Sequence, residues 1–205
     1  MTVFAGTQMK FSAKLIEDNK GNVMKARKST SNVSQPEVGT HVARLVGIVD
    51  LGHQPGFEYQ GKPVPSSYKI RLTYELPNSK MDDGRPHWVS EEITNSDNEK
   101  STLSARVRTL KGTFDDLTSL LNKPCTVTLV ETKNGYVKID GQGGVGGIPA
   151  GFEAAPLSNP TFVFSLDTPD LDVFNGLPEF IQDRIRDNLD YVGSELHMAL
   201  ENPQY

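Results

Sequence analysis

Residues 68–76, YKIRLTYEL, alternate strictly between apolar and polar side chains. Successive side chains of a β-strand point to opposite faces, so this pattern predicts a strand with one face against a core. Four more segments predict strands, at residues 41–51, 87–94, 124–132 and 136–140. The chain is therefore expected to be mainly β.

The period changes between the third and fourth predicted strands. Leu103, Val107 and Leu110 repeat at helical spacing, and capping-box patterns stand at residues 96–99 and 113–116. Five strands with helices between the third and fourth is the order of an OB-fold, a small Greek-key barrel. An open five-stranded sheet with a helix packed on one face is the structural alternative.

Two short signals refine this prediction. Gly47 lies inside the first strand, where a glycine often marks a bulge or a sharp bend. Asn134-Gly135 stands between the last two strands and predicts a tight hairpin. Residues 52–67 are rich in Gly and Pro and are expected to form a long loop.

Charge divides the chain into three predicted parts. Although the net charge is -5, residues 1–40 hold six Lys/Arg and three Asp/Glu, whereas residues 141–205 hold two basic and ten acidic residues. The expected parts are a basic N-terminal arm at 1–38, the OB-fold domain at 39–142, and a C-terminal extension at 143–205. That extension comprises a linker, a short strand at 161–166 and an acidic helix or tail.

The outer faces of the predicted strands carry the candidate binding residues. Exposed aromatic rings stack on unpaired bases, and Lys or Arg neutralise phosphates along a groove, so this combination is typical of a single-strand binder. The candidates on strands are Lys69, Arg71, Trp88, Tyr136 and Lys138; those in loops or elsewhere are Phe57, Tyr59, Lys62, Arg85 and Arg44.

Less specific interpretations stay open for several of these residues. Outer cations are commonly only solvated, and Arg106, Arg108 and Lys111 are expected on a solvated helix face. Trp88 is alternatively covered by the linker or by the TFVF segment of residues 161–164, and Tyr136 is alternatively a cross-strand packing partner.

No enzymatic motif stands out. The paired acids fall at predicted caps and turns, and the histidines lack the spacing of metal ligands. No catalytic residue, cofactor or metal site is predicted. Two rivals remain, an OB-fold adaptor that binds proteins and no nucleic acid, and a small metal-dependent nuclease with acids converging from different strands.

The single cysteine, Cys125, predicts a small buried residue and suits a reducing compartment. No apolar run approaches the ~18 residues of a membrane span, and the N-terminus lacks the pattern of a signal peptide. The expected location is the cytoplasm, with no membrane partner, and the oligomeric state is left open.

Six segments in order resemble the single-stranded DNA-binding proteins encoded by tailed bacteriophages: VARLVGIVDLG, YKIRLTYELP, DDGRP, EKSTL, LLNKPC and NPTFVFSLD. The resemblance runs from about residue 42 to 187. It implies an OB-fold that coats single-stranded DNA during replication and recombination, without sequence preference and without catalysis.

The C-terminal part is similar to the acidic ends of replication single-strand binders, which recruit partner proteins. This similarity implies partner contacts at Asp187, Asp190, Glu195, Glu201 and Tyr205. Because residues 177–192 read as a helix with an apolar stripe of Phe180, Ile181, Ile185 and Leu189, a helix docked on the barrel with its acids in water is the alternative.

Overall fold

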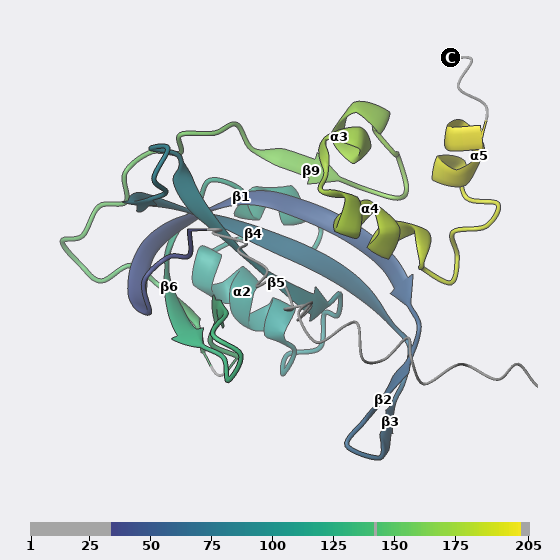
Figure 1. Cartoon of the computed structure of the whole chain (residues 1–205), viewed down its shortest axis with the longest axis horizontal. Helices are drawn as coiled ribbons and strands as arrows, with labels where there is room; N and C mark the ends of the chain where they lie inside the picture. The colour runs from purple at the N-terminus through teal and green to yellow at the C-terminus, as the bar shows by residue number, and fades with distance from the viewer. Residues whose placement is uncertain (1–33, 142, 202–205) are drawn as a thin grey trace, which may run out of the picture. The chain divides into compact units, whose positions relative to one another are not determined.

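The structure is a computed structural model that describes residues 34–141 and 143–201 (Figure 1). It is mainly β, as the sequence predicts. The strands are β1 (Gly39–Gln54), β2 (Phe57–Tyr59), β3 (Lys62–Val64), β4 (Ser67–Lys80), β5 (Pro86–Thr94), β6 (Pro124–Glu131), β7 (Val137–Ile139), β8 (Val145–Gly146) and β9 (Phe162–Phe164). The helices are α2 (Thr102–Leu110), the 3₁₀ helix η1 (Leu117–Leu120), α3 (Leu171–Gly176), α4 (Glu179–Arg186) and α5 (Glu195–Glu201).

The main sheet has the strand order β5-β4-β1-β6-β7, and all of these neighbours are antiparallel. The long strand β1 pairs with β6 through its first half and with β4 from Arg44 onward, with a register shift at Leu45/Gly47. The predicted bend at Gly47 is therefore confirmed. The edge strands β5 and β7 approach within 8 Å between Cα atoms, and no ladder joins them in the described residues, so the sheet is not closed.

The five predicted strands correspond to β1, β4, β5, β6 and β7. The predicted hairpin at Asn134-Gly135 is confirmed, since Gly135 has a φ of 78° and its N–H donates to the carbonyl of Thr132. Residues 52–67 were predicted to form a long loop, but they contain the two-stranded hairpin β2–β3. The predicted arm at residues 1–33 lies outside the described residues.

Helix α2 begins at a different cap from the one predicted. Ser101 has an extended backbone, and its hydroxyl accepts a hydrogen bond from the Ser104 N–H at 3.0 Å. The Ser96 hydroxyl instead accepts from the Asn98 N–H within the preceding turn. The prediction that Ser96 caps the helix was therefore wrong, because α2 begins at Thr102 and the adjacent Ser101 satisfies its free N–H groups.

The first hydrophobic core lies on the inner face of the sheet, under α2. Ile70, Leu72 and Tyr74 of β4 are buried there, together with Leu103 of α2 and Cys125 of β6. Each fully buried Leu or Ile side chain stabilises the fold by ~1.5–3 kcal/mol. Cys125 is fully buried, as predicted, and burial raises the pKa of its thiol to about 12.

A second core lies on the opposite face of β1. Val49 and Leu51 pack there against residues 161–201, which we call the C-terminal module. Strand β9 pairs parallel to β1, and Figure 1 shows α3 and α4 on the side of the sheet opposite α2. The expectation that 161–166 forms a short strand is thus confirmed. No helix in the described ranges is long and apolar enough to cross a lipid bilayer.

Candidate nucleic-acid interface

The outer face of β4 and β5 carries predicted binding residues, but it is only partly open to solvent. Lys69 and Arg71 point outward as predicted, yet both are half-buried, and Arg71 lies beside residues of the C-terminal module. Arg71 donates to Glu92 at 3.2 Å, and its guanidinium lies 5.5 Å from the centre of the Phe180 ring. Burial lowers the pKa of Arg71 against the opposing effect of Glu92.

Trp88 is held in one position although 44% of it is exposed. Its ring stacks on Phe162 of β9, with centroids 5.8 Å apart and an interplanar angle of 22°. Its indole N–H donates to Glu75 at 3.2 Å, and this buried carboxylate also accepts from the Ser158 N–H and the Asn159 amide. Trp88 is therefore both covered and exposed, because one side of it packs on the TFVF segment and the rest stays open.

A cavity of about 210 Å³ separates Trp88 from α4, and we call it the α4 groove. The hydroxyls of Thr73 and Ser90, which lie 3.0 Å apart, form a polar part of its lining. The lining residues are Val49, Arg71, Thr73, Trp88, Ser90, Phe162, Leu177, Pro178, Phe180 and Ile181.

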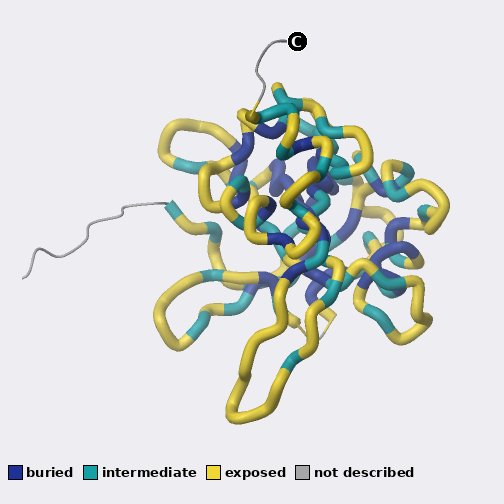
Figure 2. Tube along the Cα trace, turned by 90° about the vertical axis from the view of Figure 1, so that its right-hand side faces the viewer, coloured by how far each residue is buried: buried dark blue, intermediate teal, exposed yellow. Residues whose placement is uncertain are grey.

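Hairpin β2–β3 projects from the lower edge of the sheet in Figure 1 and is exposed along nearly all of its length (Figure 2). Phe57 and Tyr59, at 60% and 61% exposure, alternate with Glu58 and so share one face of the hairpin. Tyr59 pairs with Lys62 across the turn. Gln60 and Gly61 both have positive φ, as a type I′ turn requires.

Tyr136 and Lys138 are exposed where the β6–β7 turn enters β7. The Tyr136 N–H donates to the Thr132 hydroxyl at 3.1 Å, which fixes the backbone of the turn. Gln35 lies beside this turn, because its amide donates to the Gly135 carbonyl and accepts from the Val137 N–H at 2.7 Å. The side chains of Tyr136 and Lys138 therefore lie on a hydrogen-bonded edge and point outward, as the sequence predicts.

Two other predicted cations already have partners. The Arg44 guanidinium donates to the carbonyls of Asn122, Ala154 and Ala155 at 2.7 to 2.9 Å, so it anchors the linker to the sheet. Arg44 was expected to contact phosphate, but in the structure it has a structural role. Arg85 is exposed in its turn and forms an ion pair with Asp83 at 2.6 Å, which raises the pKa of Arg85.

The predicted partner-binding acids do not form a free tail within the described residues. Asp187 and Glu195 are exposed, whereas Asp190 contacts His53 and Tyr68, and Glu201 pairs with His197 at 3.2 Å. Tyr205 lies outside the described residues. The chain up to Glu201 instead folds into α3, α4 and α5 against the sheet, which is the docked alternative.

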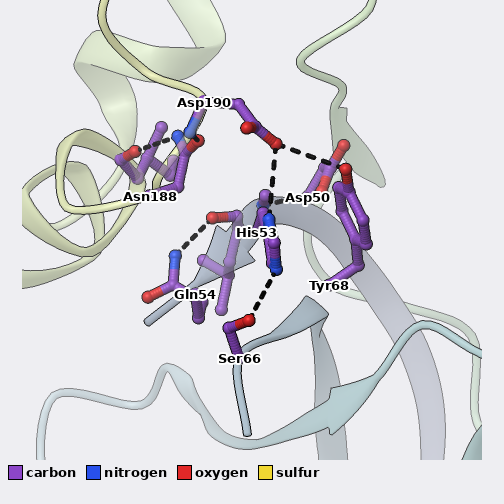
Figure 3. A network of polar contacts seen from close by, with 10 residues as sticks. Asp50, His53, Gln54, Ser66, Tyr68, Asn188 and Asp190 are labelled. Atoms are coloured by element: carbon purple, nitrogen blue, oxygen red, sulfur yellow. Dashed lines mark hydrogen bonds and ion pairs between the residues drawn. The ribbon is translucent and has the colours of Figure 1, made fainter. Parts of the chain in front are cut away.

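The stem of the hairpin is tied to the loop after α4 by a polar network (Figure 3). His53 contacts the Ser66 hydroxyl at 3.0 Å and the Asp190 carboxylate at 3.7 Å, and it stacks on Tyr68 with ring centroids 4.7 Å apart. The Gln54 amide donates to the Arg184 carbonyl at 2.9 Å. These contacts hold the stem of the hairpin against α4 and the loop that follows it.

The apolar stripe predicted for residues 177–192 was wrong in part. Ile181 and Ile185 are buried, but Phe180 is 60% exposed and Leu189 is also exposed. Sequence reasoning anticipated that the TFVF segment, which contains Phe162, covers Trp88, but it missed Phe180, which lines the same cavity as Trp88. Among the described residues, no group of three or more His, Cys, Asp or Glu is placed to hold a metal ion.

Comparison with known proteins gives no relative. The chain matches no protein family, no curated protein and no solved structure at a significant level.

Proposed function

We propose that this chain is a non-enzymatic OB-fold protein that binds single-stranded DNA without sequence preference. The strand order supports the OB-fold. Strands β1, β4 and β5 are consecutive neighbours, β6 returns to the other edge of β1, and β7 comes near β5. Helix α2 lies between the third and fourth of these five strands, as in that barrel.

The observation that carries the proposal is the exposure of aromatic rings on two particular loops. OB-folds bind oligonucleotides through the loops that join strands one to two and four to five. In this chain the first loop is hairpin β2–β3, with Phe57 and Tyr59, and the second is the β6–β7 turn, with Tyr136. Rings exposed in this way gain little from the fold, whereas stacking on a base contributes ~1–3 kcal/mol each.

The cations supply the second part of the interface. Lys62 lies on the hairpin beside Tyr59, and Lys138 follows Tyr136 on β7 with one residue between them. Lys69 and Arg71 lie on the outer face of β4, and Arg71 also lines the α4 groove. Local positive charge of this kind neutralises phosphates even though the whole chain is acidic.

The resemblance to phage single-stranded DNA-binding proteins supplies the biological setting of the proposal. The protein would coat single strands during phage replication or recombination in the host cytoplasm. The exposed acids Asp187 and Glu195 of the C-terminal module would then contact partner proteins of those processes.

The test is fluorescence anisotropy with labelled oligo-dT at low salt. The wild type is expected to bind, and Phe57→Ala or Tyr59→Ala to weaken binding by roughly 5- to 150-fold, equivalent to ~1–3 kcal/mol for one lost stacking contact. Phe152→Ala, which removes an equally exposed ring from the linker, is the matched control and is expected to bind as the wild type does.

The same samples separate the two rivals. A wild-type protein that leaves oligo-dT unbound at low salt would contradict the proposal and favour the adaptor. Degradation of the oligonucleotide in Mg²⁺ or Mn²⁺ would favour the nuclease, because a binding protein leaves the strand intact.

A further inference from the structure

We infer that the α4 groove is a pocket for a single unpaired nucleobase, with one wall supplied by the sheet and the other by the C-terminal module. This inference rests on the proposed function and adds a second element to its interface. It makes residues 161–201 part of the DNA site, in addition to any contact they make with partner proteins.

The two walls are aromatic and come from distant parts of the chain. Trp88 of β5 and Phe180 of α4, which is 60% exposed, both line the groove, and the Arg71 guanidinium lies 5.5 Å from the centre of the Phe180 ring. Phe162, which also lines the groove, stacks on Trp88, and the indole N–H of Trp88 donates to the Glu75 carboxylate. Because Trp88 is already immobilised in the free protein, a base that stacks on it loses less affinity to side-chain ordering.

The interior of the groove suits the edge of a base. Thr73 and Ser90 present hydroxyls, each of which can donate or accept a hydrogen bond after rotation. Such groups accommodate every base, in keeping with binding that lacks sequence preference. The volume of about 210 Å³ is below the ~300–1,000 Å³ of pockets for drug-sized ligands, so it fits one ring system.

Charge at the rim favours a nucleotide over an apolar peptide side chain. Arg71 lines the groove, and Glu92 pairs with Arg71 at 3.2 Å and with Arg184 at 3.7 Å. Two guanidinium groups thus share the single carboxylate of Glu92. The remaining positive charge is suited to the phosphates on either side of an inserted base.

The groove also lies within reach of the exposed hairpin. Strand β4 starts at Ser67 in the hairpin stem, and Arg71 follows four residues later, about 13 Å along an extended strand. The network of Figure 3 holds the stem against the loop after α4. A single strand that stacks on Tyr59 can therefore continue over β4 into the groove.

The test uses the full chain and oligo-dT, with Trp88 fluorescence as a local readout, since Trp88 is the only tryptophan. In the wild type, saturation with oligo-dT is expected to quench Trp88. Phe180→Ala is expected to weaken binding by roughly 5- to 150-fold and to reduce the quenching, while Phe180→Tyr restores both. Leu189→Ala, an exposed apolar residue beyond the end of α4, is the matched control.

The outcomes distinguish the groove from the rest of the interface. If the Phe180→Ala variant binds oligo-dT with wild-type affinity and its Trp88 fluorescence is not quenched, the groove is not a base pocket. The groove would then belong to another occupant, such as an apolar side chain of a partner protein. If the hairpin variants still lose affinity in that case, the proposed function stands. A wild type that fails to bind oligo-dT overturns both.

Discussion

A charged residue that the sequence pattern places on the surface is buried in the structure. Arg106 was expected on a solvated helix face, but it is 4% exposed. Its guanidinium donates twice to Glu91, at 2.8 and 2.9 Å, and the Tyr74 hydroxyl donates to the same carboxylate at 2.9 Å. Burial lowers the pKa of Arg106, but the hydrogen bonds and charge of Glu91 outweigh it and hold that pKa above its ordinary value.

Removal of one partner from this network should destabilise the fold strongly. Arg106→Met leaves the Glu91 carboxylate without its cation in the inner core, and the expected loss in the free energy of unfolding is ~3–5 kcal/mol. Urea denaturation followed by circular dichroism measures this loss. Arg108→Met changes an exposed arginine of the same helix, and its effect should stay within ~0.5 kcal/mol. Equal effects of the two substitutions would contradict a structural role for Arg106.

At the scale of elements, the contact between β9 and β1 depends on a missing side chain. A Cβ atom at Gly47 would lie 2.1 to 2.6 Å from three ring atoms of Phe162, which is far inside van der Waals contact. Phe162 is the ring that supports Trp88. The glycine in β1 therefore serves two purposes, the bend of the strand and the close approach of β9.

Gly47→Ala is expected to displace the Phe162 ring and to destabilise the protein by ~1–3 kcal/mol through overpacking. The emission of Trp88 should change at the same time, because its stacking partner moves. In a Phe162→Ala background the same substitution should cost less, with a coupling of ~0.5–3 kcal/mol. Strictly additive effects would show that the two residues do not meet. Gly147→Ala, at a glycine with open space around it, is the control.

At the scale of the whole molecule, two cores share one strand. Residues of β1 face the inner core on one side and the C-terminal module on the other, so the sheet and the module belong to one compact unit. The acidic residues of the module raise the negative charge of the chain without occupying the hairpin or the β6–β7 turn. Net charge alone is therefore a poor guide to what this surface binds.

The affinity for single-stranded DNA should fall as salt rises, although the protein carries a net charge of -5. The logarithm of the binding constant is expected to decrease with the logarithm of salt concentration by ~0.7 per phosphate contacted. Lys62→Gln should reduce this slope by ~0.7. Lys100→Gln, at an exposed lysine on the approach to α2, should leave it unchanged. Binding that does not vary with salt would exclude phosphate contacts altogether.

The sequence by itself determined the strands and their two faces. The period-two pattern of residues 68–76 correctly separates buried Ile70 and Leu72 from outward Lys69 and Arg71, because alternation is a local property of an extended backbone. The Asn134-Gly135 hairpin was predictable for the same reason. The Gln60-Gly61 turn of β2–β3 offered a weaker signal of the same kind, which was missed.

Only the tertiary structure decided what lies against those faces. Trp88 meets Phe162, Glu75 meets Ser158 and Asn159, and Arg44 meets the carbonyls of residues 154–155, all across more than 70 positions of sequence. Such contacts arise from the packing of the linker and the C-terminal module on the sheet, and neither periodicity nor composition encodes which residues will meet. The outward direction of a side chain can thus be predicted from the sequence, whereas its neighbours depend on how distant segments pack.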